Sequence, residues 1–517
     1  MKRRYFLSFS QKNLEIPLGT ASFGLSKIPI IKFGDWKLNF LKIATPFFLL
    51  MCNCRIITLV GYEEKIDTIV NHALTEFNVP GAAVAVVVDG KTVVCRGYGM
   101  RDLEHQLPVN VDTIFPIASN TKAFTSFLIA QLVAEGKLDW DKPIIEYLPE
   151  FHLSTEALTQ QVTLRDLIAH RTGVPRHDAL WIAIRDLSEE EVLEILPYFP
   201  PSSKLRETFV YNNFMYTVAA KVVREVTKSP WEVEMASKIL GPLHMDRSGT
   251  MNPLQRDNVA QPYAAIGGKV QTLSFHYPSS ILPAGGIHST VTDMTKWLRV
   301  HLDKTQSSFI KKEALEEMHT IHMPFTAKTG TGYGLGWEID SYRNRKQVRH
   351  GGLLEGFTSE VAFLPDEKIG IIILTNSSTD GRTAIYSIKN SIYDYLLGAE
   401  DRDWAHKFLQ ERANESEKTA TFSWLKYEGN YIHPAYGQMS ISQEYDTLYA
   451  TVGKARLELH SKSENIFEAK CSRLLAFGVD PTVQFSFIIN SLGEVDEVHV
   501  PFEQFRSAPA IVFKKCP

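Results

Sequence analysis

The chain has 517 residues, 44% of them hydrophobic, which is enough apolar material for a large core and for more than one domain. Its 55 Lys and Arg nearly balance its 59 Asp and Glu, so the formal net charge of −4 provides no field that would attract nucleic acid. The five cysteines are too scattered for a disulfide framework. We therefore expect a globular protein without a nucleic-acid partner.

Residues 1–61 differ in composition from the rest of the chain. Residues 1–42 contain eight basic side chains and two acidic ones, and an apolar run over residues 43–52 follows. A basic flank before a short apolar run is typical of an export signal or a membrane anchor, and this run is too short to span a bilayer. We predict export or membrane association through this segment. A lipid on Cys52, a twin-arginine signal at Arg3–Leu7 and an extension without a targeting role are the alternatives.

A β-hairpin and a buried helix are the first elements expected in the globular part. Apolar runs on both sides of Asp89-Gly90 predict two strands joined by a type I′ turn, because both turn positions favour these residues. The stretch from Ser119 to Gly136, "SNTKAFTSFLIAQLVAEG", is apolar on nearly every side and ends in glycine. This pattern predicts a helix buried in the core.

Helices dominate the middle of the chain, because residues 163–302 mix helical stretches with loops rich in Pro and Gly. Strands return between residues 347 and 376, and an amphipathic stretch over residues 383–398 predicts a helix that closes at Gly398. Strands at both ends of a segment with helices between them favour one antiparallel sheet with an inserted helical subdomain. We therefore predict an α+β domain over residues 62–398.

Two further parts are expected after this domain. Residues 399–420 are charged and predict a linker or an exposed helix. From residue 421 to residue 517, short runs alternate between apolar and polar side chains. This alternation predicts a small all-β, barrel-like domain at the end of the chain.

Ser119 and Lys122 are the first candidate catalytic residues. Three positions apart at the start of a helix, they lie on one face, where the helix N-terminus favours an alkoxide and burial lowers the pKa of a lysine. Ser308 and Ser423 also precede a lysine by three positions, but only Ser119 opens a helix that is apolar all round. Ser119 is the predicted nucleophile, and an ordinary serine at a helix cap is the alternative.

Tyr211 and Asn213, just before a predicted helix, form the second candidate group. A phenol beside a lysine can shuttle the proton of the nucleophile, and an asparagine two residues on can bind a substrate carbonyl. Tyr342 and Asn344 have the same spacing, but they lie in the polar run "SYRNRKQ", which predicts an exposed turn. We therefore prefer Tyr211 and Asn213.

Seven segments between residues 62 and 398 resemble, in this order, the serine β-lactamase and penicillin-binding protein superfamily: "VPGAAVAVVVDGK", "IFPIASNTKAFTSFLIAQLVAEGKLDWDKPIIEYLP", "VTLRDLIAHRTGVP", "FVYNNFMY", "PAGGIHSTVTDMTKWL", "YGLGW" and "HGGLLEGFTSEVAFLPDEKIGIIILTN". The branch is the one that contains class C β-lactamases, β-lactamase-fold esterases and D-amino-acid peptidases. The resemblance implies a β-lactamase/transpeptidase-like fold. The last segment, with "YEGNYIHPAYGQMSI", is similar to the lipocalin-like β domain often appended to such enzymes.

The resemblance also implies roles for individual residues. In the family the serine is acylated, a lysine and a tyrosine handle protons, and each oxyanion-hole donor contributes about 3 kcal/mol. The residues that it assigns are, for catalysis, Ser119, Lys122 and Tyr211; for substrate binding, Asn213, His350 and Gly352; and for the oxyanion hole, the backbone N–H groups of Ser119 and Leu353.

The third motif of the family has two candidates in this chain. Lys328-Thr329-Gly330 has the common form, but in the family the motif follows a segment like "YGLGW", which begins here at Tyr333. The glycines after Lys328 also make a poor strand, whereas "QVRHGG" alternates as a strand does. His350 is therefore the predicted residue. An imidazole that titrates near a pKa of about 6.5 would hold a substrate carboxylate as a cation only below about pH 7.

We expect a serine hydrolase that forms an acyl-enzyme with a small-molecule ester, amide or peptide, without a cofactor or a metal ion. His319 and His322 lack a third ligand nearby, and His170 is expected to brace a loop. A true β-lactamase or D-Ala carboxypeptidase is one alternative, although Glu355 beside the third motif would repel carboxylate-bearing substrates. A non-catalytic binding protein that keeps the fold is the other. The oligomeric state and the physiological substrate stay open.

Overall fold

The computed structural model describes residues 62–517, except for residues 267–268, 278, 303–308, 327–329, 413–426, 445–446, 464, 473, 475–480, 490–494, 503–509 and 517. The predictions for residues 1–61 lie outside the described part of the chain. Among the described residues, no helix combines the length and the apolar composition needed to cross a bilayer.

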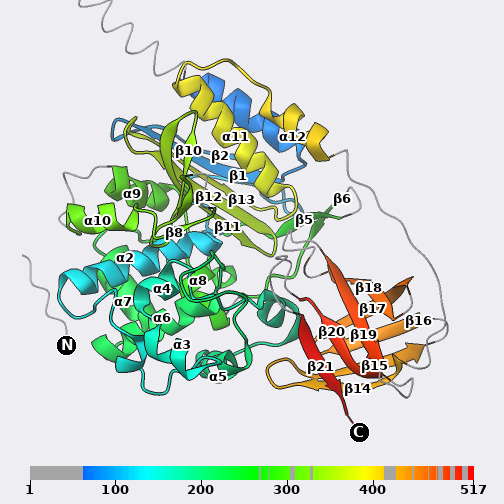
Figure 1. Ribbon diagram of the computed structural model, residues 1–517. Helices are drawn as coiled ribbons and strands as arrows, with labels where there is room; N and C mark the ends of the chain where they lie inside the picture. The colour runs from blue at the N-terminus through cyan, green and yellow to red at the C-terminus, as the bar shows by residue number, and fades with distance from the viewer. Residues whose placement is uncertain are drawn as a thin grey trace, which may run out of the picture. The chain divides into compact units, whose positions relative to one another are not determined.

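A large antiparallel sheet forms the centre of the α+β domain (Figure 1). Within the described residues its strand order is β3-β2-β1-β13-β12-β11-β10-β9-β8, so the first hairpin of the domain pairs with one of its last strands. This confirms the predicted sheet assembled from distant segments. The strands are β1 Gly81–Val88, β2 Lys91–Asp102, β3 Leu107–Pro108, β8 Met323–Pro324, β9 Gly332–Tyr333, β10 Glu338–Tyr342, β11 Arg345–Leu354, β12 Phe357–Leu364 and β13 Ile369–Thr375.

The turn between β1 and β2 has the predicted geometry. Asp89 has a φ of 49° and Gly90 a φ of 73°, which are the two left-handed positions of a type I′ turn. The sharp connection matches the twist of the two strands, so the hairpin can pair along its length.

Helices cover both faces of the sheet, because β1 is apolar on both sides. Alternate residues of β1 belong to two separate core clusters. One cluster includes α11 (Gly381–Leu396) and a helix over residues 62–76, which the sequence did not predict. The other includes α2 (Thr121–Ala134) and α9 (Val291–Leu302). As predicted, α2 is buried almost all round and is followed by a left-handed Gly136.

The helical subdomain packs against α2 and carries short strand pairs in its connections. Its longest helix is α6 (Phe214–Thr227), which is amphipathic and buries its apolar side against α2 and α8 (Leu282–Gly285). Its other elements include α3 Glu156–Gln161, α4 Leu164–Ile168, η3 Leu180–Ile184, α5 Glu189–Ile195, α7 Trp231–Met235, α10 Lys312–Met318, and the strand pairs β4 Phe115–Pro116 with β7 His288–Ser289 and β5 Tyr263–Ile266 with β6 Lys269–Thr272.

The C-terminal part is a closed antiparallel barrel, preceded by α12 (Trp404–Arg412). Alternate side chains such as those of Tyr431, Phe485 and Phe513 are buried inside it, so the predicted all-β domain is confirmed. Its described strands are β14 Gly429–His433, β15 Gly437–Glu444, β16 Thr447–Val452, β17 Ala455–Ser463, β18 Ile466–Lys470, β19 Thr482–Ile489, β20 Val495–Val500 and β21 Ile511–Lys515.

Candidate active site

Ser119 lies in a short turn of 3-10 helix, η1 (Ala118–Asn120), that leads into α2. The residue before it, Ala118, has a left-handed φ of 49°, a conformation that L-residues adopt only when their surroundings hold it. Ser359 of β12 holds this turn, because its hydroxyl donates to Ile117 O at 2.7 Å and accepts from Asn120 Nδ2 at 2.8 Å. The sheet therefore fixes the position of the predicted nucleophile.

Gly352 explains how closely β11 approaches this turn. A Cβ at this position would lie 2.3 Å from the carbonyl oxygen of Ile117 and 2.2 Å from the Ser359 hydroxyl. Only glycine allows the approach, and it brings the neighbouring Leu353 to the wall of the pocket that holds Ser119. The structure places both predicted oxyanion-hole residues at this wall, and their role stays a prediction.

Lys122 is completely buried in the first turn of α2. Its Nζ lies 3.1 Å from Ser119 Oγ, 2.8 Å from Asn213 Oδ1 and 2.9 Å from Ala284 O. As a neutral amine it donates its two N–H groups to Asn213 and Ala284 and turns its lone pair to the Ser119 hydroxyl. Burial lowers the pKa of Lys122 well below its usual value, because an ammonium is poorly solvated there. A neutral amine next to Ser119 can accept the proton of the hydroxyl.

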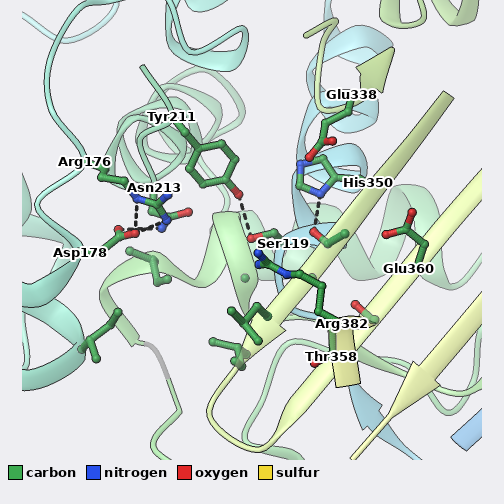
Figure 2. A pocket seen from close by; sticks show the side chains of 18 of the residues that line it. Ser119, Arg176, Asp178, Tyr211, Asn213, Glu338, His350, Thr358, Glu360 and Arg382 are labelled. Atoms are coloured by element: carbon green, nitrogen blue, oxygen red, sulfur yellow. Dashed lines mark hydrogen bonds and ion pairs between the residues drawn. The ribbon is translucent and has the colours of Figure 1, made fainter. Parts of the chain in front are cut away.

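Tyr211 and Asn213 reach the same point from the start of α6 (Figure 2). The Tyr211 hydroxyl donates to Ser119 Oγ at 2.9 Å, and burial raises the pKa of this phenol, so it stays protonated. Asn213 accepts from Lys122 and donates from Nδ2 to Asp178 Oδ1 at 2.9 Å. The structure thus brings Ser119, Lys122, Tyr211 and Asn213 into direct contact.

His170 braces the loop that carries Tyr211, as expected from the sequence. Its carbonyl oxygen accepts from Val210 N at 2.9 Å, and its Nδ1 accepts from Asn212 N at 3.1 Å. The side chain of Asn212 completes the anchor by donating to Val174 O and Pro175 O. Backbone bonds on both sides of Tyr211 therefore fix where its ring points.

His350 lies in β11 and lines the pocket, but its imidazole is not a free donor. Its Nδ1 is 2.7 Å from Gly351 O and its Nε2 is 2.8 Å from the Tyr333 hydroxyl. Burial lowers the pKa of His350 to about 3, so the ring is neutral, donates to Gly351 and accepts from Tyr333. The expected titration near neutral pH is therefore wrong. The rival Lys328 lies outside the described residues.

Glu355 also differs from its expected place. It is 5% exposed and pairs with His276, whose Nδ1 lies 3.1 Å from a carboxylate oxygen, and it does not line the pocket. The prediction that Glu355 repels substrate carboxylates at the pocket mouth is therefore wrong.

The Tyr342 and Asn344 pair does lie at a turn between β10 and β11, as predicted.

The pocket over Ser119 has a volume of about 570 Å³ and mixes apolar with charged side chains. Leu474 and Phe502 of the C-terminal part contribute to its wall, which the sequence did not predict. In the described part of the chain, no cluster of side chains suits a metal ion. Charged residues that line the pocket and were also missed are Arg176, Asp178, Glu338, Glu360 and Arg382.

Comparison with known proteins identifies the family. A model described as "Beta-lactamase" matches residues 66–390, and one described as a domain of unknown function, DUF3471, matches residues 413–515. The chain belongs to the β-lactamase family. Its similarity to named hydrolases identifies it as a hydrolase of that family. The C-terminal barrel corresponds to the match over residues 413–515.

Three relatives show how far the similarity extends. The protein named "Unguisins hydrolase ungD'" from Aspergillus campestris (strain IBT 28561) is 28% identical over 437 residues, covering 75% of this chain and 79% of the relative. The octameric penicillin-binding protein homologue from Pyrococcus abyssi has 26% identity and a TM-score of 0.61, covering 87% of this chain and 99% of its own. EstCE1, a hydrolase with promiscuous acyltransferase activity, shares the fold with a TM-score of 0.59 at 16% identity, over 65% of this chain and all of its own. The similarity to the Pyrococcus abyssi protein spans both the α+β domain and the barrel.

Proposed function

We propose that this protein is a serine hydrolase that cleaves an ester or amide bond of a small molecule or peptide through an acyl-enzyme at Ser119. The observation that carries the proposal is the pair of contacts at Ser119 Oγ, to Lys122 Nζ at 3.1 Å and to the Tyr211 hydroxyl at 2.9 Å. One partner has a depressed pKa and the other a raised pKa, so a base and an acid meet at one oxygen.

Acylation follows from this arrangement. Ser119 Oγ loses its proton to the neutral Lys122 and bonds to the substrate carbonyl carbon, whose oxygen takes up the π electron pair. The backbone N–H groups of Ser119 and Leu353 would stabilise this oxyanion. When the oxyanion collapses, the bond to the leaving group breaks, and the alkoxide or amine takes a proton from Tyr211. Tyr211 regains a proton from Lys122, which returns to its neutral form.

Deacylation reverses the proton path. A water molecule gives its proton to Lys122 and bonds to the acyl carbon, and Ser119 Oγ leaves and is reprotonated through Tyr211. The product is a carboxylic acid, and the enzyme returns to its starting state. Neither step requires His350, whose neutral ring instead fixes β11 through Tyr333 and Gly351.

The pocket favours substrates with apolar groups, because Trp181, Phe209, Phe325 and Phe502 line it.

Arg382, at the start of α11, supports a second candidate function. It is exposed at the pocket and forms no ion pair with the other described residues, so it can bind a substrate carboxylate. A D-Ala carboxypeptidase or a β-lactamase would use such a cation. Export or membrane association through residues 1–61 stays part of the proposal.

Burst kinetics with a p-nitrophenyl ester test the proposal. An acyl-enzyme releases about one equivalent of p-nitrophenol per chain before the steady state whenever deacylation is slower than acylation. Ser119→Ala should abolish both the burst and turnover, while Ser126→Ala, a control in the same helix, should keep them. Turnover that survives in Ser119→Ala would exclude this nucleophile. Absence of turnover with esters, amides and peptides would favour the non-catalytic binding protein.

A further inference from the structure

The segment Arg176–Asp178 contacts the active site on one side and the C-terminal barrel on the other. Arg176 and Asp178 line the pocket, whereas His177, which has a left-handed φ of 49°, does not. His177 is 1% exposed, its ring stacks on Phe199 at 3.7 Å, and its Nδ1 forms a hydrogen bond of 2.9 Å with the hydroxyl of Tyr436. Tyr436 lies in the barrel, between β14 and β15. Three consecutive residues therefore link two parts of the chain.

The side of this segment that faces the pocket holds the catalytic groups in place. Asp178 accepts from Asn213 Nδ2 at 2.9 Å, which turns the amide so that its oxygen faces Lys122 Nζ at 2.8 Å. Arg176 forms an ion pair with Asp178, and its guanidinium lies 4.7 Å from the centre of the Tyr211 ring. A shift of this segment would therefore disturb both Asn213 and Tyr211.

The barrel contacts this segment at two points, through Tyr436 at His177 and through Lys454 at Ile184. Tyr436 is 2% exposed, and its ring stacks on Phe502 at 5.3 Å with an angle of 9° between the planes. Phe502 itself lines the pocket. Further along the segment, Lys454 of the barrel donates its backbone N–H to Ile184 O at 2.8 Å. Residues 176–184 are thus held by the barrel at both ends.

We propose that the barrel positions the catalytic groups: Tyr436 holds His177, and this contact keeps Arg176 and Asp178 against Tyr211 and Asn213. The inference rests on the acyl-enzyme function proposed above. His177 and Tyr436 are positioning residues, because they act through their neighbours. A displacement of about 1 Å at a reacting group can cost about 10²-fold in rate, so loosening this segment should slow acylation more than it weakens binding.

The full-length variant Tyr436→Phe tests the proposal, because it removes only the hydroxyl and keeps the ring against Phe502. We expect kcat for an ester to fall about fivefold to tenfold, with KM changed by less than about twofold. Hydrogen exchange in residues 176–184 should become faster. Tyr431→Phe is the matched control: its hydroxyl donates to Tyr427 O at 2.8 Å inside the barrel, so kcat and exchange in residues 176–184 should stay at wild-type values.

His177→Asn provides a second variant that should fold even if Tyr436→Phe does not. Asparagine tolerates the left-handed φ and places an amide near the position of Nδ1, so it should retain most of the wild-type kcat. A fall in kcat of about fivefold or more in this variant would contradict a role for the hydrogen bond.

Several outcomes overturn the proposal. An unchanged kcat in Tyr436→Phe does so directly. A lower kcat with unchanged exchange in residues 176–184 does so as well, because the effect then follows another route, and equal losses in Tyr431→Phe would indicate general damage to the barrel. If the wild-type protein forms no acyl-enzyme, the proposed function fails instead, and hydrogen exchange still decides whether Tyr436 holds the segment.

Discussion

Replacing Arg176 with methionine is expected to move the acidic limb of the acylation pH profile to higher pH. Lys122 must be neutral to accept the proton of Ser119, so acylation increases as pH rises through the pKa of Lys122. The Arg176 cation lowers this pKa and the Asp178 carboxylate raises it. Removing the cation therefore raises the pKa of Lys122, and Asp178→Asn should shift the limb in the opposite direction.

The size of the shift follows from the distances. The Arg176 guanidinium and Lys122 Nζ each lie 4.7 Å from the centre of the Tyr211 ring, so they are separated by at most twice that distance. At that limit two unit charges interact by about 0.4 kcal/mol in water and by about 1.8 kcal/mol at an effective dielectric constant of about 20. The expected displacement is therefore about 0.3 to 1.3 pH units.

The assay is the rate of Ser119 labelling by a fluorophosphonate as a function of pH, which reports acylation without product release. The other titratable groups around Lys122 include Tyr211, Tyr216, His170 and His350. Burial raises the pKa values of both phenols and lowers the pKa values of both histidines, so all four stay neutral. Shifts of the same sign in Arg176→Met and Asp178→Asn, or no shift in either, would refute Lys122 as the base.

Three other substitutions, one of them with a matched control, test separate parts of the account. Tyr211→Phe should reduce kcat by about 10²-fold with an unchanged circular dichroism spectrum. Near-normal turnover would show that the phenol does not transfer a proton during the reaction. Arg382→Gln should raise KM about threefold to tenfold for a carboxylate-bearing substrate and leave KM for a neutral ester unchanged, since only the carboxylate loses an ion pair with Arg382. Equal effects on both substrates would contradict this role. Gly352→Ala should slow labelling at least about tenfold and lower the melting temperature, because its Cβ would lie 2.3 Å from Ile117 O. Gly351→Ala, whose Cβ would first meet a Glu360 oxygen at 3.1 Å, should be milder, and the reverse order would refute the packing argument.

The sequence predicted those features that depend on local pattern. Asp89-Gly90 specified its turn, and the all-round apolar stretch after Ser119 specified a buried helix, because both signals are contained within a few neighbouring residues. The contact of Ser119 with Lys122 is equally local, since three positions on one helix bring the side chains together. Tyr211 and Asn213 were chosen because the order of motifs restricted the choice, and the structure brings them next to Ser119 and Lys122.

Features that depend on distant packing were missed. The sequence predicted His350 as a pocket residue, but it showed neither the burial that lowers its pKa nor the hydrogen bond to Tyr333, which lies on another strand. Glu355 was expected at the pocket because nothing in the sequence shows that it pairs with His276. Leu474 and Phe502 of the C-terminal part line the pocket by contacts that no local periodicity encodes. Arg176 and Asp178 carried one local signal, two charges placed directly after a predicted motif segment.

Peptide mapping of the fluorophosphonate adduct tests the central claim most directly. The account predicts one adduct per chain, on the peptide that contains Ser119, formed more slowly when Lys122 is replaced by methionine and absent from Ser119→Ala. An adduct on another residue, or labelling of Ser119→Ala at the wild-type rate, would contradict the assignment of Ser119 as the nucleophile.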